Sequence, residues 1–233
     1  MSYLIAKIGL APILLAQGLF VATTMERLPE PHGERQGIDG QGPRLRLLVL
    51  GDSAAAGVGV QTQQEALLGN LMTQLSPHFE LHWKLIARTG ATSNATLRHL
   101  QKIPAEPFDV VVTSLGVNDV VTNKTTQTFL REQKDIITLL KTKFTASQII
   151  LFGIPPMGEF PALPQPFRWY LGDQSKHLDQ VLECLAATEQ CDYIKQDLVD
   201  DPQLMATDGF HPGHGIYTIW ANEVAKYILR REV

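Results

Sequence analysis

Short apolar runs alternate with amphipathic stretches along most of the chain, and this alternation is the feature that most constrains its fold. Apolar runs, several of them rich in β-branched residues, occupy residues 45–50, 81–87, 108–114 and 148–154, with a shorter one at 193–194. Apolar residues recur at helical spacing over residues 65–75, 95–102, 129–143, 176–187 and 215–231. Strands that alternate with helices are typical of a parallel sheet covered by helices on both faces. The pattern therefore predicts an α/β fold with a central parallel sheet.

The first 43 residues differ in composition and hydrophobic pattern from the rest of the chain. Residues 8–22 are mostly apolar, but Pro12 and Gln17 interrupt the run, and a spanning helix needs about 20 apolar residues. Residues 28–43 are rich in proline, glycine and polar side chains without periodicity, so we interpret them as a linker. We therefore divide the chain into an apolar segment (1–27), a linker (28–43) and one folded domain (44–233).

Three interpretations of the apolar segment stay open. It is an uncleaved anchor or membrane-surface helix, a cleaved signal peptide, or an apolar helix docked on the domain. The first would place residues 4–24 on a membrane. The first two favour a membrane-associated or extracytoplasmic location over a freely cytoplasmic one.

Charge and cysteine content exclude some partners. The formal net charge is −4, and no basic stripe is interleaved with aromatic residues, so we expect no nucleic-acid partner. The spacing of Cys184 and Cys191 fits no zinc motif. Two free thiols and a small disulfide loop both remain open for this pair.

Polar motifs follow the first three predicted strands. GDS (51–53) directly follows residues 45–50, Gly90 lies shortly after 81–87, and GVND (116–119) follows 108–114. A fourth motif, DGFHP (208–212), lies just before the last predicted helix. Ligands of parallel α/β sheets bind outside the carboxyl ends of the strands. We therefore expect these four motifs to meet at one edge of the sheet.

The motifs together supply what acyl transfer needs. A serine hydroxyl such as that of Ser53 is a weak nucleophile until a base takes its proton. His211 is the natural base, and Asp208 can orient its imidazole. Backbone N–H groups of Ser53 and Gly90 and the side-chain amide of Asn118 would stabilise the oxyanion. The sequence thus predicts a catalytic set of Ser53, Asp208 and His211 with an oxyanion hole of Ser53, Gly90 and Asn118.

Two polar residues close to the motifs, His214 and Asp119, are expected to have structural rather than catalytic roles. His214 has no acid three residues upstream, so we expect it on the surface or at the start of the last helix. Asp119 is expected to fix its loop by hydrogen bonds rather than act as a second catalytic acid. The chain has neither a GxSxG elbow nor a GK[ST] phosphate loop.

In content and order the four blocks resemble those of the SGNH (GDSL-type) hydrolases, from about residue 44 to the C-terminus. Ala54 departs from the family signature, which often has Leu there. The resemblance assigns the same roles to Ser53, Gly90, Asn118, Asp208 and His211. It also implies a three-layer α/β/α, flavodoxin-like fold and no metal or organic cofactor.

The resulting hypothesis is a serine esterase that acts through an acyl-enzyme on Ser53. Lipid-like or small acyl esters, including lysophospholipids and thioesters, are the expected substrates, because the apolar N-terminus and the loop bearing Phe160, Phe167 and Trp169 favour a hydrophobic molecule. One alternative is a carbohydrate O-acetylesterase of the same family. Another is a non-catalytic, membrane-tethered binding module that retains the fold.

Overall fold

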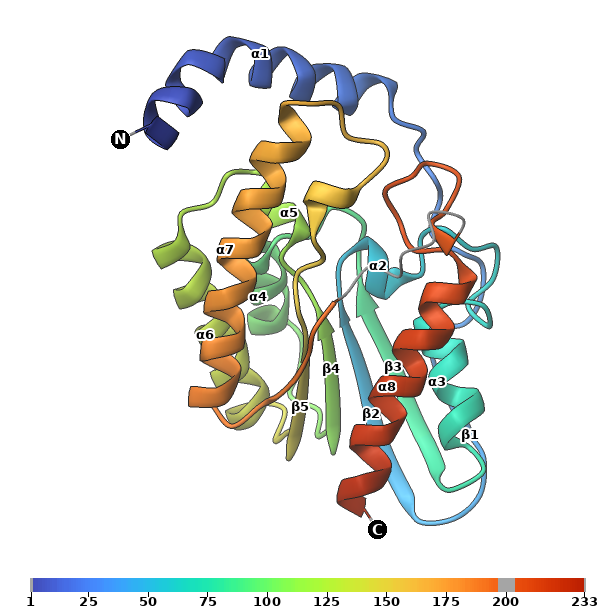
Figure 1. Cartoon of the computed structure of the whole chain (residues 1–233). Helices are drawn as coiled ribbons and strands as arrows, with labels where there is room; N and C mark the ends of the chain where they lie inside the picture. Colours follow the sequence, from blue (N-terminus) through green and yellow to red (C-terminus); the bar gives the residue numbers. More distant parts are fainter. Residues whose placement is uncertain (1, 197–203, 233) are drawn as a thin grey trace.

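A six-stranded sheet forms the centre of the molecule in the computed structural model, which describes residues 2–196 and 204–232 (Figure 1). The strand order is β1-β3-β2-β4-β5-β6. All neighbouring strands pair in parallel except β1, which pairs antiparallel with β3 at the edge. The strands are β1 (Gln36–Asp39), β2 (Arg44–Gly51), β3 (Glu80–Ala87), β4 (Val110–Ser114), β5 (Gln148–Phe152) and β6 (Asp192–Ile194).

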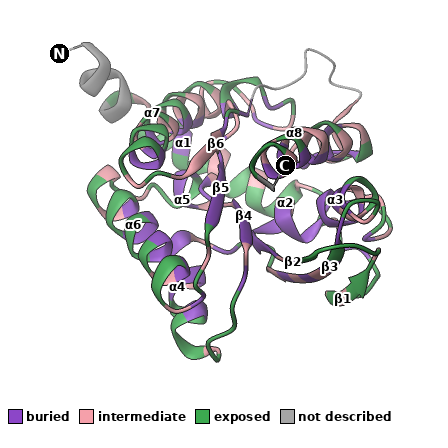
Figure 2. Cartoon of the chain, turned by 90° about the horizontal axis from the view of Figure 1, so that it is seen from below, coloured by how far each residue is buried: buried purple, intermediate pink, exposed green. Residues whose placement is uncertain are grey.

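Helices cover both faces of the sheet and make the predicted three-layer α/β/α sandwich (Figure 2). The described helices are α1 (Ser2–Thr24), α2 (Ser53–Ala56), α3 (Leu67–Leu75), α4 (Ser93–Lys102), α5 (Val117–Val121), α6 (Thr126–Thr142), the 3₁₀ turn η1 (Met157–Glu159), α7 (Phe167–Thr188) and α8 (His214–Glu232). Successive side chains of a strand point to opposite faces, so β2 contributes side chains to the hydrophobic cores on both faces of the sheet. Leu48 packs with α4, α6 and α7, whereas Leu47 packs with α3 and α8.

The expected linker at 28–43 is wrong in part, because its residues 36–39 form β1. An edge strand pairs through its backbone and can leave its side chains in solvent, so it needs no apolar pattern. Ile38 is accordingly 66% exposed. Gly37 lies under the ring of Trp83, where a Cβ would come within 2.7 Å of that ring. Gly37, which indicates a loop when the sequence is considered alone, therefore allows β1 to pack against Trp83.

The apolar N-terminal segment forms α1, which crosses the carboxyl-terminal end of the sheet beside the start of α7 (Figure 1). Gln17 joins the two segments: its Nε2 donates to Gln165 O at 2.7 Å, and its Oε1 accepts from Phe167 N at 3.0 Å. Leu14 is buried, but Leu15 and Leu19 are exposed. Within the described residues, no helix is both long and apolar enough to cross a membrane.

Two other expectations concern the second half of the chain. Helix α7 begins at Phe167, about nine residues before the predicted helix at 176, so the proline-rich loop is shorter than expected. Cys184 and Cys191 are free thiols in the structure. Burial raises the pKa of the Cys191 thiol to about 11, so the thiol form predominates at neutral pH.

Candidate active site

Ser53 stands at the tight junction between β2 and α2. A Cβ on Gly51 would come within 2.2 Å of Ser114 O on β4, so only glycine fits at this strand end. Asp52 then caps α2, since its Oδ1 accepts the N–H of Ala54 at 3.1 Å. The chain turns here, and Ser53 becomes the first residue of α2 with a side chain at the carboxyl edge of the sheet.

The loop before α8 holds Asp208 and His211 together through hydrogen bonds within a tight turn. Asp208 Oδ1 accepts the backbone N–H groups of Phe210 and His211, each at 3.0 Å. Gly209 between them has a φ of +61°, a conformation that L side chains rarely adopt. This turn leaves the other carboxylate oxygen, Oδ2, 2.5 Å from Nδ1 of His211. The DGFHP motif therefore orients the His211 imidazole through contacts within the motif itself, and it leaves Nε2 free to face another residue.

The far side of that imidazole contacts Ser53. His211 Nε2 lies 3.0 Å from Ser53 Oγ, although the two residues are 158 positions apart in the chain. The side chain of Asp208 is fully buried behind them. Burial alone would raise the Asp208 pKa, but hydrogen bonds from the His211 side chain and from the backbone of His211 and Phe210 lower it overall. A carboxylate thus supports the imidazole at neutral pH.

The predicted oxyanion residues gather beside Ser53 from separate strand ends. Asn118, in the first turn of α5, donates from Nδ2 to Ala91 O at 3.0 Å and to Asp52 Oδ2 at 3.3 Å. Ala91 directly follows Gly90, so this amide ties the loop after β3 to the loop after β4. Gly90 has a φ of +76° and open space around its Cα, and its residue type is therefore required by backbone conformation rather than by crowding.

Asp52 has no role predicted from its sequence context, yet its carboxylate is central to this arrangement. It is 2% exposed and contacts both Ala54 N and the Asn118 amide. Burial raises its pKa to about 7, and the N–H of Ala54 and the charge of His211 only partly oppose that rise. Asp52 is a single polar residue that follows Gly51 at the end of β2. It belongs to no repeating apolar pattern, so the sequence does not indicate that it is buried.

Asp119 and His214 have the structural roles expected of them. Asp119 is fully buried and accepts from Ser93 N at 3.0 Å, from Ser93 Oγ at 2.7 Å and from Lys124 Nζ at 2.6 Å. Lys124 also pairs with Glu132 of α6. This buried network fixes the loop that carries Asn118. His214 is exposed and is the first residue of α8.

A small, mostly apolar cavity of about 40 Å³ adjoins Ser53 and His211. Phe160 lines it, together with Phe210, whose ring centroid lies 5.1 Å from that of Phe160 and 5.2 Å from the His211 imidazole. Its other lining residues include Pro155, Gln196, Met205, Ile216 and Trp220.

The expectation that Phe167 and Trp169 share the cavity-forming loop is wrong. Both residues belong to α7. The Phe167 ring lies beside Gly18 of α1, and neither residue lines the cavity. The periodicity of α7 begins in a stretch where prolines dominate the local composition, which hid its start.

Three solved structures share the fold: a lipolytic protein of the G-D-S-L family from Veillonella parvula (TM-score 0.64, 14% identity, 79% of this chain and 98% of that one), the psychrotrophic esterase EstA from Pseudoalteromonas sp. (0.60, 19%, 79% and 97%) and the carbohydrate acetylesterase Est24 from Sinorhizobium meliloti (0.58, 15%, 80% and 99%). At these identities the likeness shows the fold alone.

Family membership rests on the sequence itself. No curated protein matches the chain. The sequence profile of the GDSL-like lipase/acylhydrolase family, however, matches residues 49–219, which is most of the chain and includes all four motifs. The protein therefore belongs to the GDSL-like lipase/acylhydrolase family, the SGNH group of carboxylic ester hydrolases.

Proposed function

We propose that the protein is a serine esterase with Ser53 as nucleophile, His211 as base and Asp208 as the acid that orients the base. One observation supports this above all others: an unbroken line of contacts runs from Asp208 Oδ2 through both ring nitrogens of His211 to Ser53 Oγ, at 2.5 Å and 3.0 Å. Both distances fall within hydrogen-bond reach, as proton transfer between nucleophile and base requires.

The proposed reaction has two halves. Ser53 Oγ attacks the ester carbonyl carbon while His211 Nε2 takes the hydroxyl proton. The bond from that carbon to the leaving oxygen then breaks, and the imidazolium returns the proton to the leaving alcohol. Water, deprotonated by the same imidazole, attacks the acyl-enzyme and releases the carboxylic acid and free Ser53.

The oxyanion of each tetrahedral intermediate would be bound by the N–H groups of Ser53 and Gly90 and by Asn118 Nδ2. Neither backbone N–H has a hydrogen-bond acceptor within the part of the chain that the structure describes. Asn118 donates weakly to Asp52, at 3.3 Å, and firmly to Ala91, at 3.0 Å. The longer bond can be exchanged for the developing oxyanion while the shorter one keeps the amide in place.

The cavity beside Ser53 favours a short acyl group. Its volume of about 40 Å³ admits only a few atoms the size of a water oxygen, and the aromatic rings of Phe160 and Phe210 line it. The same observation keeps a carbohydrate O-acetylesterase as the second candidate, because an acetyl group is the smallest such acyl unit. Est24, one of the structural neighbours, is described as a carbohydrate acetylesterase.

We further propose that α1 associates with a membrane surface and thereby holds the site close to the bilayer. Its outward face exposes Ile13, Leu15, Leu19 and Phe20, at 48%, 76%, 68% and 60%. Leu15 and Leu19 lie one turn apart along α1 and Ile13 and Phe20 lie two turns apart, and exposed apolar side chains of this kind favour the interface of a bilayer. Helix α1 lies at the same end of the sheet as α2, whose first residue is Ser53 (Figure 1).

A fluorophosphonate probe tests the proposed chemistry. We expect the probe to label Ser53 in the wild-type chain and to leave Ser53→Ala unlabelled, as located by mass spectrometry. Wild-type protein should also hydrolyse 4-nitrophenyl acetate and butyrate faster than the dodecanoate, with 4-nitrophenol release as the readout. Label on another residue would remove Ser53 from the mechanism, and a folded wild-type chain without label or turnover would favour the non-catalytic binding module.

A further inference from the structure

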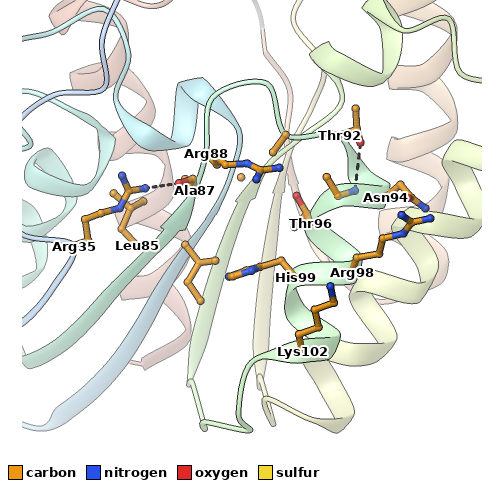
Figure 3. A pocket seen from close by; sticks show the side chains of 14 residues that line it. Arg35, Leu85, Ala87, Arg88, Thr92, Asn94, Thr96, Arg98, His99 and Lys102 are labelled. Atoms are coloured by element: carbon orange, nitrogen blue, oxygen red, sulfur yellow. Dashed lines mark hydrogen bonds between the residues drawn. The ribbon is translucent and has the colours of Figure 1, made fainter.

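A second and much larger hollow, of about 640 Å³, opens on the α4 face of the sheet, next to the candidate active site. One wall is the carboxyl end of β3, including Leu85 and Ala87, and the other is α4, including Thr96 and His99 (Figure 3). Helix α4 packs mainly against α6 and makes little contact with β3, and the hollow lies between α4 and β3. Its volume lies within the range of small-molecule sites, about 300–1,000 Å³.

The lining is strongly cationic. Arg88 reaches across from the end of β3, and His99 points from α4 towards β3 (Figure 3). Arg98 and Lys102 add two more basic groups from α4. No aspartate or glutamate lines the hollow among the residues that the structure describes.

Two of these basic side chains line the hollow without an acidic partner in the described part of the chain. Within residues 2–196 and 204–232, the structure gives neither Arg88 nor Lys102 an ion pair or side-chain hydrogen bond. By contrast, Arg35 at the rim is held by Glu30 at 2.8 Å. Unneutralised positive charge in a concave site attracts anions, most of all those with several charged oxygens.

The hollow and the proposed oxyanion hole share a wall. Gly51, two residues before Ser53, lines the hollow, and so does Ala91, the residue after Gly90. Ala91 O accepts the Asn118 amide at 3.0 Å. Ala91 therefore faces the hollow while its carbonyl oxygen holds the Asn118 amide beside Gly90. A molecule with its ester carbonyl at Gly90 can extend its alcohol portion into the cationic hollow.

We infer that this hollow binds a phosphate group carried by the leaving alcohol of the substrate. The inference rests on the proposed serine esterase activity and narrows it to short-chain acyl esters of phosphorylated alcohols. A phosphate monoester presents about two negative charges on three oxygens, which suits several separate donors better than a single carboxylate does. The acyl group enters the small apolar cavity, and hydrolysis releases the acid and the phosphorylated alcohol without breaking a phosphorus–oxygen bond.

Two matched esters test the inference: 1-butyryl-glycerol 3-phosphate and 1-butyrylglycerol, assayed by butyrate release. We expect the wild-type KM to be about tenfold lower for the phosphorylated ester, a difference that shrinks as ionic strength rises. The double variant Arg88→Gln/Lys102→Gln should lose this preference and keep wild-type kinetics on 1-butyrylglycerol. The control Arg131→Gln/Lys176→Gln removes two exposed charges from α6 and α7 and should retain it.

Binding measurements separate this inference from the proposed activity. Glycerol 3-phosphate, which is not hydrolysed, should bind the wild-type protein in calorimetry and bind the double variant at least about tenfold more weakly. Such binding without any ester hydrolysis would contradict the esterase and leave the anion site standing. Hydrolysis of both esters with equal KM would contradict the phosphate site and leave the esterase standing. Inorganic phosphate that binds as tightly as glycerol 3-phosphate would show a site for the free anion and overturn the assignment to a leaving group.

Discussion

The carboxylate of Asp208 lies 2.5 Å from Nδ1 of His211 and is itself fully buried. An Asp208→Asn substitution keeps the side-chain shape but presents an amide that can favour the wrong imidazole tautomer. We expect the folded variant to lose up to about 10⁴-fold in kcat on a soluble ester, and His211→Ala to lose at least as much. Steady-state kinetics, with circular dichroism to check folding, give the answer. A loss of only a few-fold in Asp208→Asn would show that the acid is dispensable.

Asn118→Ala should reduce kcat by about 10²–10³-fold with little change in KM, because an oxyanion donor acts mainly in the transition state. The same amide also donates hydrogen bonds to Ala91 O and Asp52 Oδ2, so a loss of activity caused by a disturbed structure must be distinguished from the loss of an oxyanion donor. Asn70→Ala is the matched control, since the Asn70 amide also donates two hydrogen bonds, to the backbone carbonyls of Glu65 and Ala66, but lies in α3. A raised KM with unchanged kcat in Asn118→Ala would assign the residue to substrate binding alone.

Asp52 makes the stability of the fold depend on pH. Its pKa rises from 3.8 to about 7 on folding, so the folded state binds this proton more tightly than the unfolded chain does. The resulting stabilisation is complete below the unfolded pKa of 3.8 and is lost as pH rises to about 7. The limiting slope is about 1.4 kcal/mol per pH unit.

Asp52→Asn should therefore flatten the fall in the free energy of unfolding over this pH interval, whatever its effect at a single pH. Urea denaturation across the interval measures the slope. The exposed Asp135 of α6 supplies a control, and Asp135→Asn should keep the wild-type slope. Parallel pH profiles for wild type and Asp52→Asn would refute the raised pKa.

Leu19→Glu should weaken binding of the full chain to phosphatidylcholine vesicles in a flotation assay, because it places a charge on the exposed apolar face of α1. Ile38→Glu on β1 is a closely matched control, since Leu19 and Ile38 are 68% and 66% exposed. Hydrolysis of 4-nitrophenyl acetate should be the same in both variants. Equal vesicle binding by Leu19→Glu and the wild type, or none by either, would remove α1 from membrane association.

Much of the fold and of the candidate site was predictable from local pattern. Apolar runs such as residues 148–154 identify buried strands because burial of both faces leaves no room for polar alternation. The strands that precede Ser53 and Asn118 then place both residues at one edge, since parallel strands end on the same side of a sheet. The roles proposed for Ser53 and His211 rest on side-chain chemistry, and the assays above test them.

Other features depend on contacts between distant parts of the chain, and no local pattern carries them. Strand β1 was missed because its pairing with β3 uses backbone groups, and Gly37 reads as a loop residue until Trp83 covers it. The burial that raises the Asp52 pKa, the docking of α1 through Gln17, and the two hollows beside Ser53 arise from packing in the same way. Sequence by itself determined the buried strands, most of the amphipathic helices and the chemistry that follows them, because these depend on short-range periodicity and residue type. Tertiary structure alone decided cavity size, burial and unneutralised charge, because each is set by what the rest of the chain packs around a residue.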